Sequence, residues 1–303
     1  MKKTRVMIVS DVHLCHTDWY GVPTAERMER LVRHLNDEYK KEPYETIIFL
    51  GDYSLDHWNH GDVPGSFLVG TCNTRNFLDR YANRLPAPIS IFIAGNHEMY
   101  GHEKWREITG YDRRASVVVG DYVFIVDDTF DINLDPDCDC DAVYVPLNVE
   151  FIKSEMAKYP DKKVILCAHH LAFDRETPEA HELVLDERVI CMFNGHIHRS
   201  TVYILPDEWK NKAVIRTGQY SYSKENPPML SMWGFREVYL SDDEVTSAYI
   251  TPENTIVYKG ETVTVPYGKQ DEVTVKVKSA ECRVQSAELR VKSEEVDEKG
   301  VER

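Results

Sequence analysis

Five short apolar runs, each closed by a polar motif, set the pattern of this chain. They cover residues 6–9, 47–50, 89–94, 164–168 and 189–193, and Val and Ile dominate them. Short apolar runs bounded by Gly or Asp are typical of buried strands. We therefore predict five strands, each ending where a motif begins.

Segments with helical spacing and length separate these runs. Within residues 24–39, one face carries Met28, Leu31, Val32 and Leu35. Further helices are predicted at residues 66–85, 147–158 and 179–187. Strands that alternate with helices indicate an α/β fold built from βαβ units.

The pattern becomes richer in strands from residue 116 onward. Residues 116–126 place two apolar runs on either side of Gly120-Asp121, which predicts a β-hairpin. Later strands are predicted at residues 201–205, 213–217, 235–240 and 245–250. We expect residues 1–250 to form one domain, since α/β domains of roughly 250 residues are ordinary.

Each of the five predicted strands is followed by side chains that can bind a metal ion. The motifs are Asp11-Val12-His13, Gly51-Asp52, Gly95-Asn96-His97-Glu98, His169-His170 and Gly195-His196-Ile197-His198. In open α/β sheets ligands bind beyond the carboxyl ends of the strands, so these motifs are expected to converge. Their oxygen and nitrogen donors suit a hydrolytic site with two metal ions.

The order of these motifs resembles the calcineurin-like metallophosphoesterase superfamily. That superfamily shows DxH, GDx, GNH(D/E), a lone His and then GHxH, and all five parts occur here between residues 11 and 198. The resemblance implies a β-sandwich flanked by helices. It also implies hydrolysis of a phosphodiester or phosphomonoester by a metal-bridging hydroxide.

The resemblance also implies a set of metal ligands. Asp11, His13 and His198 are expected to hold one ion, Asn96, His169 and His196 the other, and Asp52 to bridge both. Such pairs lie roughly 3.5–4 Å apart. Mn²⁺ is favoured for mixed oxygen and nitrogen ligands without a thiolate, and Fe, Zn and Ni remain open.

Two adjacent residues compete for the position of the lone His. His169 closes the strand at residues 164–168, whereas His170 follows it, and Leu171 stands where the superfamily often has Pro. We prefer His169, because the residue that ends a strand is better placed to reach the edge of the sheet.

The resemblance assigns His97 as the general acid that protonates the leaving oxygen. Asp56 is the candidate to orient His97, but it lies one residue late for GDxxDRG and no Arg-Gly follows it. The chain therefore does not fit the protein Ser/Thr phosphatase branch. Glu98 is expected to accept hydrogen bonds beside the metal ligands.

Substrate contacts are expected from the loops that follow Asp52 and His97. Asn96, His57, Trp58 and Tyr100 are the candidates, and a nucleobase could stack on the aromatic rings. The alternative is that Trp58, Tyr100 and Trp105 simply pack against neighbouring loops. The segment 217–220, with sequence TGQY, ends another predicted strand and is a weaker candidate.

The seven cysteines are irregularly spaced and are expected to be reduced thiols. Cys138 and Cys140 lie in an acidic run, which we interpret as a solvated loop rather than a zinc site. Cys167 and Cys191 fall within apolar runs and are predicted to be core residues.

The net charge of −15 disfavours binding to long duplex nucleic acid or to anionic membranes. The apolar run near the amino terminus is shorter than the roughly 7–15 residues of a secretory signal, and no run approaches the ~18 residues of a membrane span. We therefore expect a soluble, cytoplasmic protein without a membrane partner. Its expected partner is a phosphoester, with nucleotides among the candidates.

The carboxyl-terminal region changes character after residue 250. Residues 251–278 are predicted to be a β-rich extension, with a hairpin at 255–258 and 262–265 and a strand at 273–277. Residues 279–303 form a polar tail with a seven-residue repeat. We interpret this tail as frayed, and the alternative is a short coiled coil that forms oligomers.

Two classes of function remain open from the sequence. The favoured one is a phosphoesterase, within which phosphodiesterase, phosphomonoesterase and nucleotide pyrophosphatase activities are alternatives. The other is a metal-binding scaffold of the same fold without catalysis.

Overall fold

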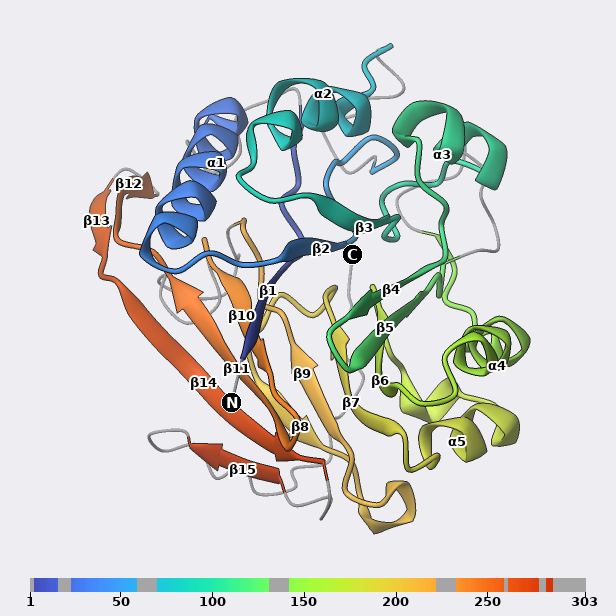
Figure 1. Cartoon of the computed structure of the whole chain (residues 1–303). Helices are drawn as coiled ribbons and strands as arrows, with labels where there is room; N and C mark the ends of the chain where they lie inside the picture. Colours follow the sequence, from blue (N-terminus) through green and yellow to red (C-terminus); the bar gives the residue numbers. More distant parts are fainter. Residues whose placement is uncertain are drawn as a thin grey trace.

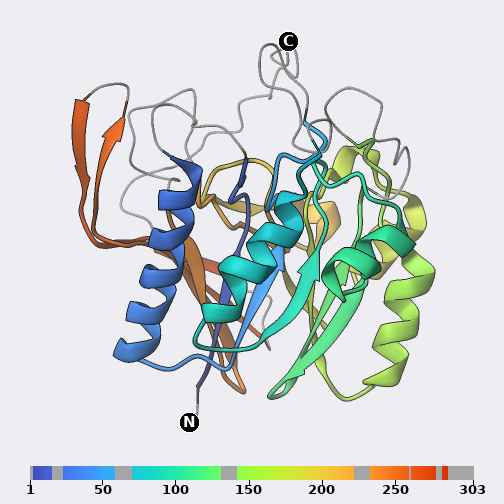
Figure 2. The same cartoon turned by 90° about the horizontal axis from the view of Figure 1, so that it is seen from above.

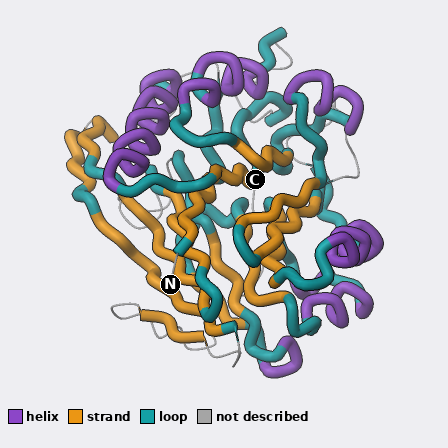
Figure 3. The backbone as a smooth tube through the Cα atoms, in the orientation of Figure 1, coloured by secondary structure: helices purple, strands orange, loops and turns teal. Residues whose placement is uncertain are grey.

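Two mixed β-sheets pack face to face and carry helices on their outer sides (Figure 1). The computed structural model describes residues 3–15, 23–58, 70–130, 142–221, 233–258, 261–277 and 282–285. Strands fill the middle of the molecule and reach its lower-left edge, and helices lie along the top and the right-hand side (Figure 3). This arrangement confirms the predicted α/β class and the β-sandwich flanked by helices.

The first sheet has seven strands in the order β15-β14-β11-β10-β1-β2-β3. Its strands are β1 (Thr4–Val9), β2 (Thr46–Leu50), β3 (Ile89–Ile93), β10 (Phe235–Leu240), β11 (Glu244–Thr251), β14 (Gly268–Lys276) and β15 (Cys282–Gln285). β1, β2 and β3 run parallel, and β10, β11, β14 and β15 add antiparallel partners. The parallel half therefore presents three carboxyl ends at one edge.

The second sheet has six strands in the order β4-β5-β6-β7-β9-β8. Its strands are β4 (Ala115–Val119), β5 (Tyr122–Asp127), β6 (Lys163–Ala168), β7 (Val189–Asn194), β8 (Val202–Ile204) and β9 (Ala213–Arg216). β5, β6, β7 and β9 are parallel, whereas β4 and β8 pair antiparallel at the edges. The hairpin predicted at residues 116–126 is β4 and β5.

Helices cover the outer face of each sheet. α1 (Thr24–Lys41), α2 (Asn73–Arg80) and α3 (His102–Thr109) lie on the first sheet, and α4 (Val149–Lys158) and α5 (Pro178–Val184) lie on the second (Figure 1). Short 3-10 turns occur at Ala82–Arg84, Phe173–Arg175 and Asp207–Trp209. Within the residues that the structure describes, no helix is long and apolar enough to cross a membrane.

The helix predicted at residues 66–85 is shorter in the structure. It begins at Asn73 and ends at Arg80, and residues 59–69 lie outside the described part of the chain. The carboxylate of Asp56 accepts hydrogen bonds from Asn73 N at 2.8 Å and Thr74 N at 3.0 Å. Because the first amides of a helix lack partners within it, this carboxylate stabilises the start of α2.

The core between the sheets is built from alternate residues of their strands. Val6 and Ile8 of β1 face this core, together with Cys167 of β6 and Cys191 of β7, and all four are fully buried. Both cysteines are free thiols, as the apolar runs predict. Cys138 and Cys140 lie outside the described residues.

The predicted division at residue 250 is not a break in the first sheet. β11 extends to Thr251, and β14 pairs with it and thus continues the same sheet. Between them, β12 (Asn254–Tyr258) and β13 (Glu261–Val265) form the predicted hairpin, which projects beside α1 (Figure 2).

At residues 282–285 both interpretations of the seven-residue repeat are wrong, the preferred frayed tail as well as the alternative coiled coil. These residues form β15, which pairs antiparallel with β14 through the register Val273↔Val284. Without β15, the edge of β14 that faces away from β11 would present unpaired backbone groups, and such an edge readily accepts another strand. Residues 278–281 and 286–303 lie outside the described part of the chain.

Arg236 of β10 connects the carboxyl-terminal strands to the last metal-binding motif. Its buried guanidinium donates hydrogen bonds to Arg216 O and Asp271 O, both at 2.9 Å, and to Ser200 O. Ser200 Oγ also donates to Asp271 Oδ2 at 2.6 Å. The segment that follows His198 is thereby fixed to β14.

Candidate metal centre

The loops after the parallel strands lie against one another. Asp11 N donates to Gly51 O at 3.1 Å, and His13 N donates to Asp52 O at 3.0 Å, so the first two motifs run side by side. His57 N donates to His97 O, which links the second motif to the third. These contacts bring motifs from distant parts of the chain to one edge of the sandwich.

Five predicted ligands adopt a left-handed backbone conformation. Their φ angles are 55° at Asp11, 49° at His13, 54° at Asp52, 64° at His196 and 57° at His198. Positive φ in a non-glycine residue is uncommon and costs about 1–3 kcal/mol, and such residues cluster at functional sites. The sharp turn at each strand end directs these side chains to a common point.

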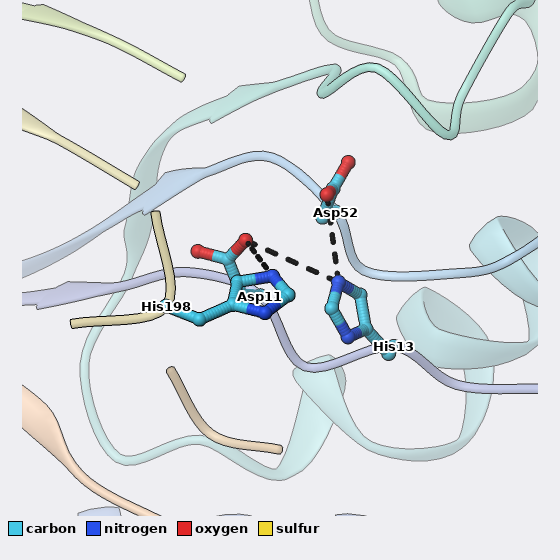
Figure 4. Close-up of side chains that lie close together, drawn as sticks. All are labelled: Asp11, His13, Asp52 and His198. Atoms are coloured by element: carbon cyan, nitrogen blue, oxygen red, sulfur yellow. Dashed lines mark hydrogen bonds and ion pairs between the residues drawn. The ribbon is translucent and has the colours of Figure 1, made fainter. Parts of the chain in front are cut away.

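Two groups of side chains meet there, and Asp52 belongs to both. One ligand atom from each member lies within 4.8 Å of the others in the first group, Asp11, His13, Asp52 and His198, and in the second group, Asp52, His169 and His196. Figure 4 shows the first group, with His13 and His198 turned toward the carboxylates. The predicted ligands are therefore brought together.

A single oxygen of Asp52 faces both groups. Asp52 Oδ2 lies 3.4 Å from His13 Nε2 and 3.2 Å from His169 Nε2. The other oxygen, Oδ1, accepts a hydrogen bond from His97 N at 3.2 Å. Since Oδ1 is held by the backbone, the shared oxygen is Oδ2.

Asn96 completes the second group with an amide oxygen. Its Oδ1 lies 2.9 Å from both His169 Nε2 and His196 Nδ1. His170 stands outside this group, and its ring stacks on Phe130. The geometry therefore favours His169 over His170 as the lone His.

The charges of the site suit cation binding. Burial raises the pKa of Asp52, but the nearby rings of His169 and His97 outweigh burial and hold it well below its ordinary value. Asp11 is likewise buried, and the adjacent His198 lowers its pKa. Both carboxylates are therefore ionised at neutral pH.

The buried imidazoles differ in their titration. Burial lowers the pKa of His13 and of His196 to about 4, so both rings are neutral at pH 7 and keep a lone pair. Burial also disfavours the charged form of His169, but Asp52 raises its pKa to about 9. A cation bound beside Asp52 would replace that proton.

The residues fit a pair of divalent cations. Among the described residues, no group makes a well-aligned hydrogen bond to the buried Asp11 Oδ1, although His198 Nε2 lies 3.1 Å from it. An ionised oxygen in that position is costly unless a positive charge compensates it. The donors are carboxylate, amide and imidazole without a thiolate, which is the set that Mn²⁺ and similar ions accept.

Close backbone contact at Gly95 makes the shared carboxylate possible. A Cβ added to Gly95 would lie 2.1 Å from Asp52 Oδ1 and 2.6 Å from Asp52 N. No side chain fits between the second and third motifs at this point.

Glu98 joins the same two motifs by hydrogen bonds. Its buried carboxylate accepts from Asp52 N at 3.0 Å, Gly95 N at 2.8 Å and Ser54 N at 2.8 Å. This matches the acceptor role expected from the sequence and fixes Asp52 in its strained conformation.

His97 lies beside the ligand groups without belonging to either. Its Nε2 is 3.7 Å from Asp52 Oδ2, and its side chain is 12% exposed. Trp58, which is partly buried, contacts it with ring centroids 6.1 Å apart. His97 therefore lies next to the candidate metal ligands.

Asp56, by contrast, is directed toward α2. In addition to the two amides of α2, its carboxylate accepts hydrogen bonds from Thr74 Oγ1 at 2.9 Å and Tyr100 Oη at 2.8 Å. These contacts give Asp56 a structural role. Its orientation of His97 stays a prediction.

The other predicted substrate contacts are more buried than the sequence suggests. His57, Tyr100 and Trp105 are at most 4% exposed. His57 Nδ1 accepts from Met99 N at 3.1 Å, and its ring packs against Tyr100. His57 and Tyr100 therefore pack within their loops, and Trp105 lies on α3 in the core of the first sheet. Trp58 is the aromatic candidate that contacts His97.

Two further residues at the site were missed by sequence reasoning. Ser221 lies directly after the TGQY segment, and Tyr220 N donates to Ser10 O, which places that segment against the first motif. Arg27 is fully buried on α1. Its position on the same helix face as Met28 and Leu31 was the available signal, because a charged residue in an apolar stripe needs a polar partner.

A comparison with protein-family models identifies the family of the chain. Residues 4–200 match the family model of the calcineurin-like phosphoesterases. The chain belongs to this family. The search of curated proteins gives no match.

Solved structures that resemble the chain do so at low sequence identity. GAP50, an anchor in the inner membrane complex of Plasmodium, is 15% identical with a TM-score of 0.52, and the alignment covers 88% of this chain and 90% of GAP50. Purple acid phosphatase PPD1 from yellow lupin (Lupinus luteus) is 13% identical with a TM-score of 0.48. The alignment covers 88% of this chain and 53% of PPD1. Vps29 from Entamoeba histolytica is 13% identical with a TM-score of 0.39. The alignment covers 88% of this chain and 99% of Vps29.

Proposed function

We propose that this chain is a phosphoesterase that uses two divalent cations. The observation that carries the proposal is Asp52 Oδ2, which faces two groups of ligands at 3.4 and 3.2 Å. Sharing of one carboxylate oxygen is the arrangement that holds two ions close enough to act on one phosphate. Membership of the calcineurin-like phosphoesterase family supports the same chemistry.

The cations, when bound, would activate a water molecule and neutralise charge on the phosphate. The residues of the chain supply the rest. Asp11 and Asp52 provide the anionic oxygens, and Glu98 holds the backbone of Asp52 in place. The strained loops thus form a preorganised site, which avoids reorganisation during the reaction.

His97 is proposed as the general acid. Its ring lies beside both ligand groups, yet it is a member of neither, which suits a residue that transfers a proton to the substrate. Proton transfer to a leaving oxygen by a positioned imidazole typically contributes 10²–10⁴-fold.

The substrate is proposed to be a phosphodiester or phosphomonoester with a planar leaving group, such as a nucleotide. Trp58 supports this class, because its ring contacts that of His97 and can stack on an aromatic leaving group. The net charge of −15 weighs against long duplex nucleic acid. Mn²⁺ is the first cation to test, followed by Fe, Zn and Ni.

The test compares hydrolysis of bis-p-nitrophenyl phosphate and p-nitrophenyl phosphate by Mn²⁺-loaded protein, with Asp52→Ala as the control. We expect metal-dependent turnover of at least one substrate, and its loss in the Asp52→Ala protein because that variant lacks the shared ligand. A preference for the diester would direct the search to nucleotides and nucleic acids, and a preference for the monoester to phosphorylated metabolites. Absence of turnover with all four metals would contradict the proposal and favour the binding scaffold.

A further inference from the structure

His13 uses one ring nitrogen toward the ligand group and the other toward Ser221. Figure 4 shows His13 in the first ligand group, and its Nε2 is the atom near Asp52. Its Nδ1 lies 3.3 Å from Ser221 Oγ. Ser221 is fully buried, so no solvent competes for this contact.

One guanidinium contacts both His13 and Ser221. Arg27 Nη2 donates to His13 O at 2.6 Å, and Arg27 Nη1 donates to Ser221 Oγ at 3.4 Å. The side chain of Arg27 is fully buried. Arg27 therefore fixes the strained backbone of His13 and the hydroxyl that faces its ring.

The hydrogen-bond chemistry of this cluster supports the tautomer of His13 whose Nε2 is free. Arginine can only donate, so it occupies one acceptor position of Ser221 Oγ, and the hydroxyl can then either accept the Nδ1–H of His13 or donate its own proton to Nδ1. With its proton on Nδ1, the ring keeps the Nε2 lone pair for a cation.

In the second ligand group, the backbone rather than Arg27 or Ser221 fixes the free ring nitrogen of the histidine. His169 Nδ1 lies 2.6 Å from the backbone oxygen of Leu50, which can only accept a hydrogen bond. The Nε2 of His169 is therefore fixed as the free nitrogen by the main chain of β2. Arg27 and Ser221 act on the first group alone.

We propose that Arg27 and Ser221 are positioning residues for His13 and set the affinity of the cation site formed by Asp11, His13, Asp52 and His198. The inference rests on the proposed function, since it requires that these residues bind a cation. Loss of such a supporting hydrogen bond typically lowers metal affinity by 10–100-fold. Substitution of Ser221 or Arg27 should therefore lower the cation affinity of this site and leave that of the second site nearly unchanged.

The test is a titration of metal-free, full-length protein with Mn²⁺ against a chromophoric chelator. In Ser221→Ala, we expect one of the two dissociation constants to rise about 10–100-fold and the other to stay within about twofold. Ser221→Thr keeps the hydroxyl and should restore most of the affinity. Ser247→Ala is the matched control, because Ser247 Oγ is buried and has no hydrogen-bond partner in the part of the chain that the structure describes.

Arg27→Met tests the guanidinium with a side chain of similar length. It should weaken the same site, and unfolding measured by circular dichroism shows whether the variant retains its fold. Ser221→Ala alone decides the proposal if Arg27→Met does not fold. Unchanged affinity at both sites in Ser221→Ala, or equal weakening of both, would overturn the inference while leaving the proposed function intact. A wild-type protein that binds none of Mn²⁺, Fe, Zn and Ni in the same titration would contradict the proposed function itself, and this inference with it.

Discussion

Replacement of His97 by Ala should lower phosphoester turnover by about 10²–10⁴-fold while two cations remain bound. The reason is the position of His97, whose Nε2 lies 3.7 Å from Asp52 Oδ2 although the ring belongs to neither ligand group. Its removal deletes a proton donor and leaves the ligands in place. On one preparation, turnover of p-nitrophenyl esters tests the loss of activity, and metal content tests whether both cations are retained.

A suitable control for this variant is His181→Ala. His181 lies on α5, where its Nε2 is 3.0 Å from Glu208 O, so its loss leaves the metal centre unchanged. Full turnover in His97→Ala would refute the general-acid role. Loss of one cation from His97→Ala would show instead that His97 acts as a ligand.

Replacement of Gly95 by Ala should remove both cations and lower turnover at least about 100-fold. The added methyl group would lie 2.1 Å from Asp52 Oδ1, so the carboxylate that both groups share must move. Overpacking of this kind costs about 1–3 kcal/mol, and a displacement near 1 Å in an active site can cost about 100-fold in rate. Metal content by atomic emission and turnover provide the measurement.

Gly101→Ala is the matched control for Gly95→Ala. Gly101 precedes α3, its φ is −58°, and an added Cβ would meet no atom within 4 Å. The control should retain both cations and its activity. If Gly95→Ala also bound two cations with wild-type affinity, close approach of the two motifs would not be the reason for glycine at this position.

The sequence predicts the fold class and the gathering of the ligands because both depend on local signals. Each ligand follows an apolar run directly, and the carboxyl ends of parallel strands necessarily share an edge. Asp52 as the shared residue came only from the family resemblance. The structure adds that Oδ2 is the shared oxygen, because His97 N holds Oδ1.

The supporting contacts could not be predicted because they join residues far apart in the chain. His13 and Ser221 are 208 positions apart, and no periodic pattern marks such a pair. Asp56 illustrates the same limit, since its carboxylate caps a helix that begins at Asn73. The strand at 282–285 was missed because a heptad pattern on a short segment does not exclude strand pairing at an open sheet edge.

The most direct test of the account is turnover of bis-p-nitrophenyl phosphate and p-nitrophenyl phosphate as Mn²⁺ is added in measured equivalents to metal-free protein. Since Asp52 Oδ2 faces two ligand groups, we predict little turnover below one equivalent and a plateau at two, with no such rise in Asp52→Ala. Full activity at one equivalent, or none with either ester at two, would contradict a phosphoesterase that requires both cation sites.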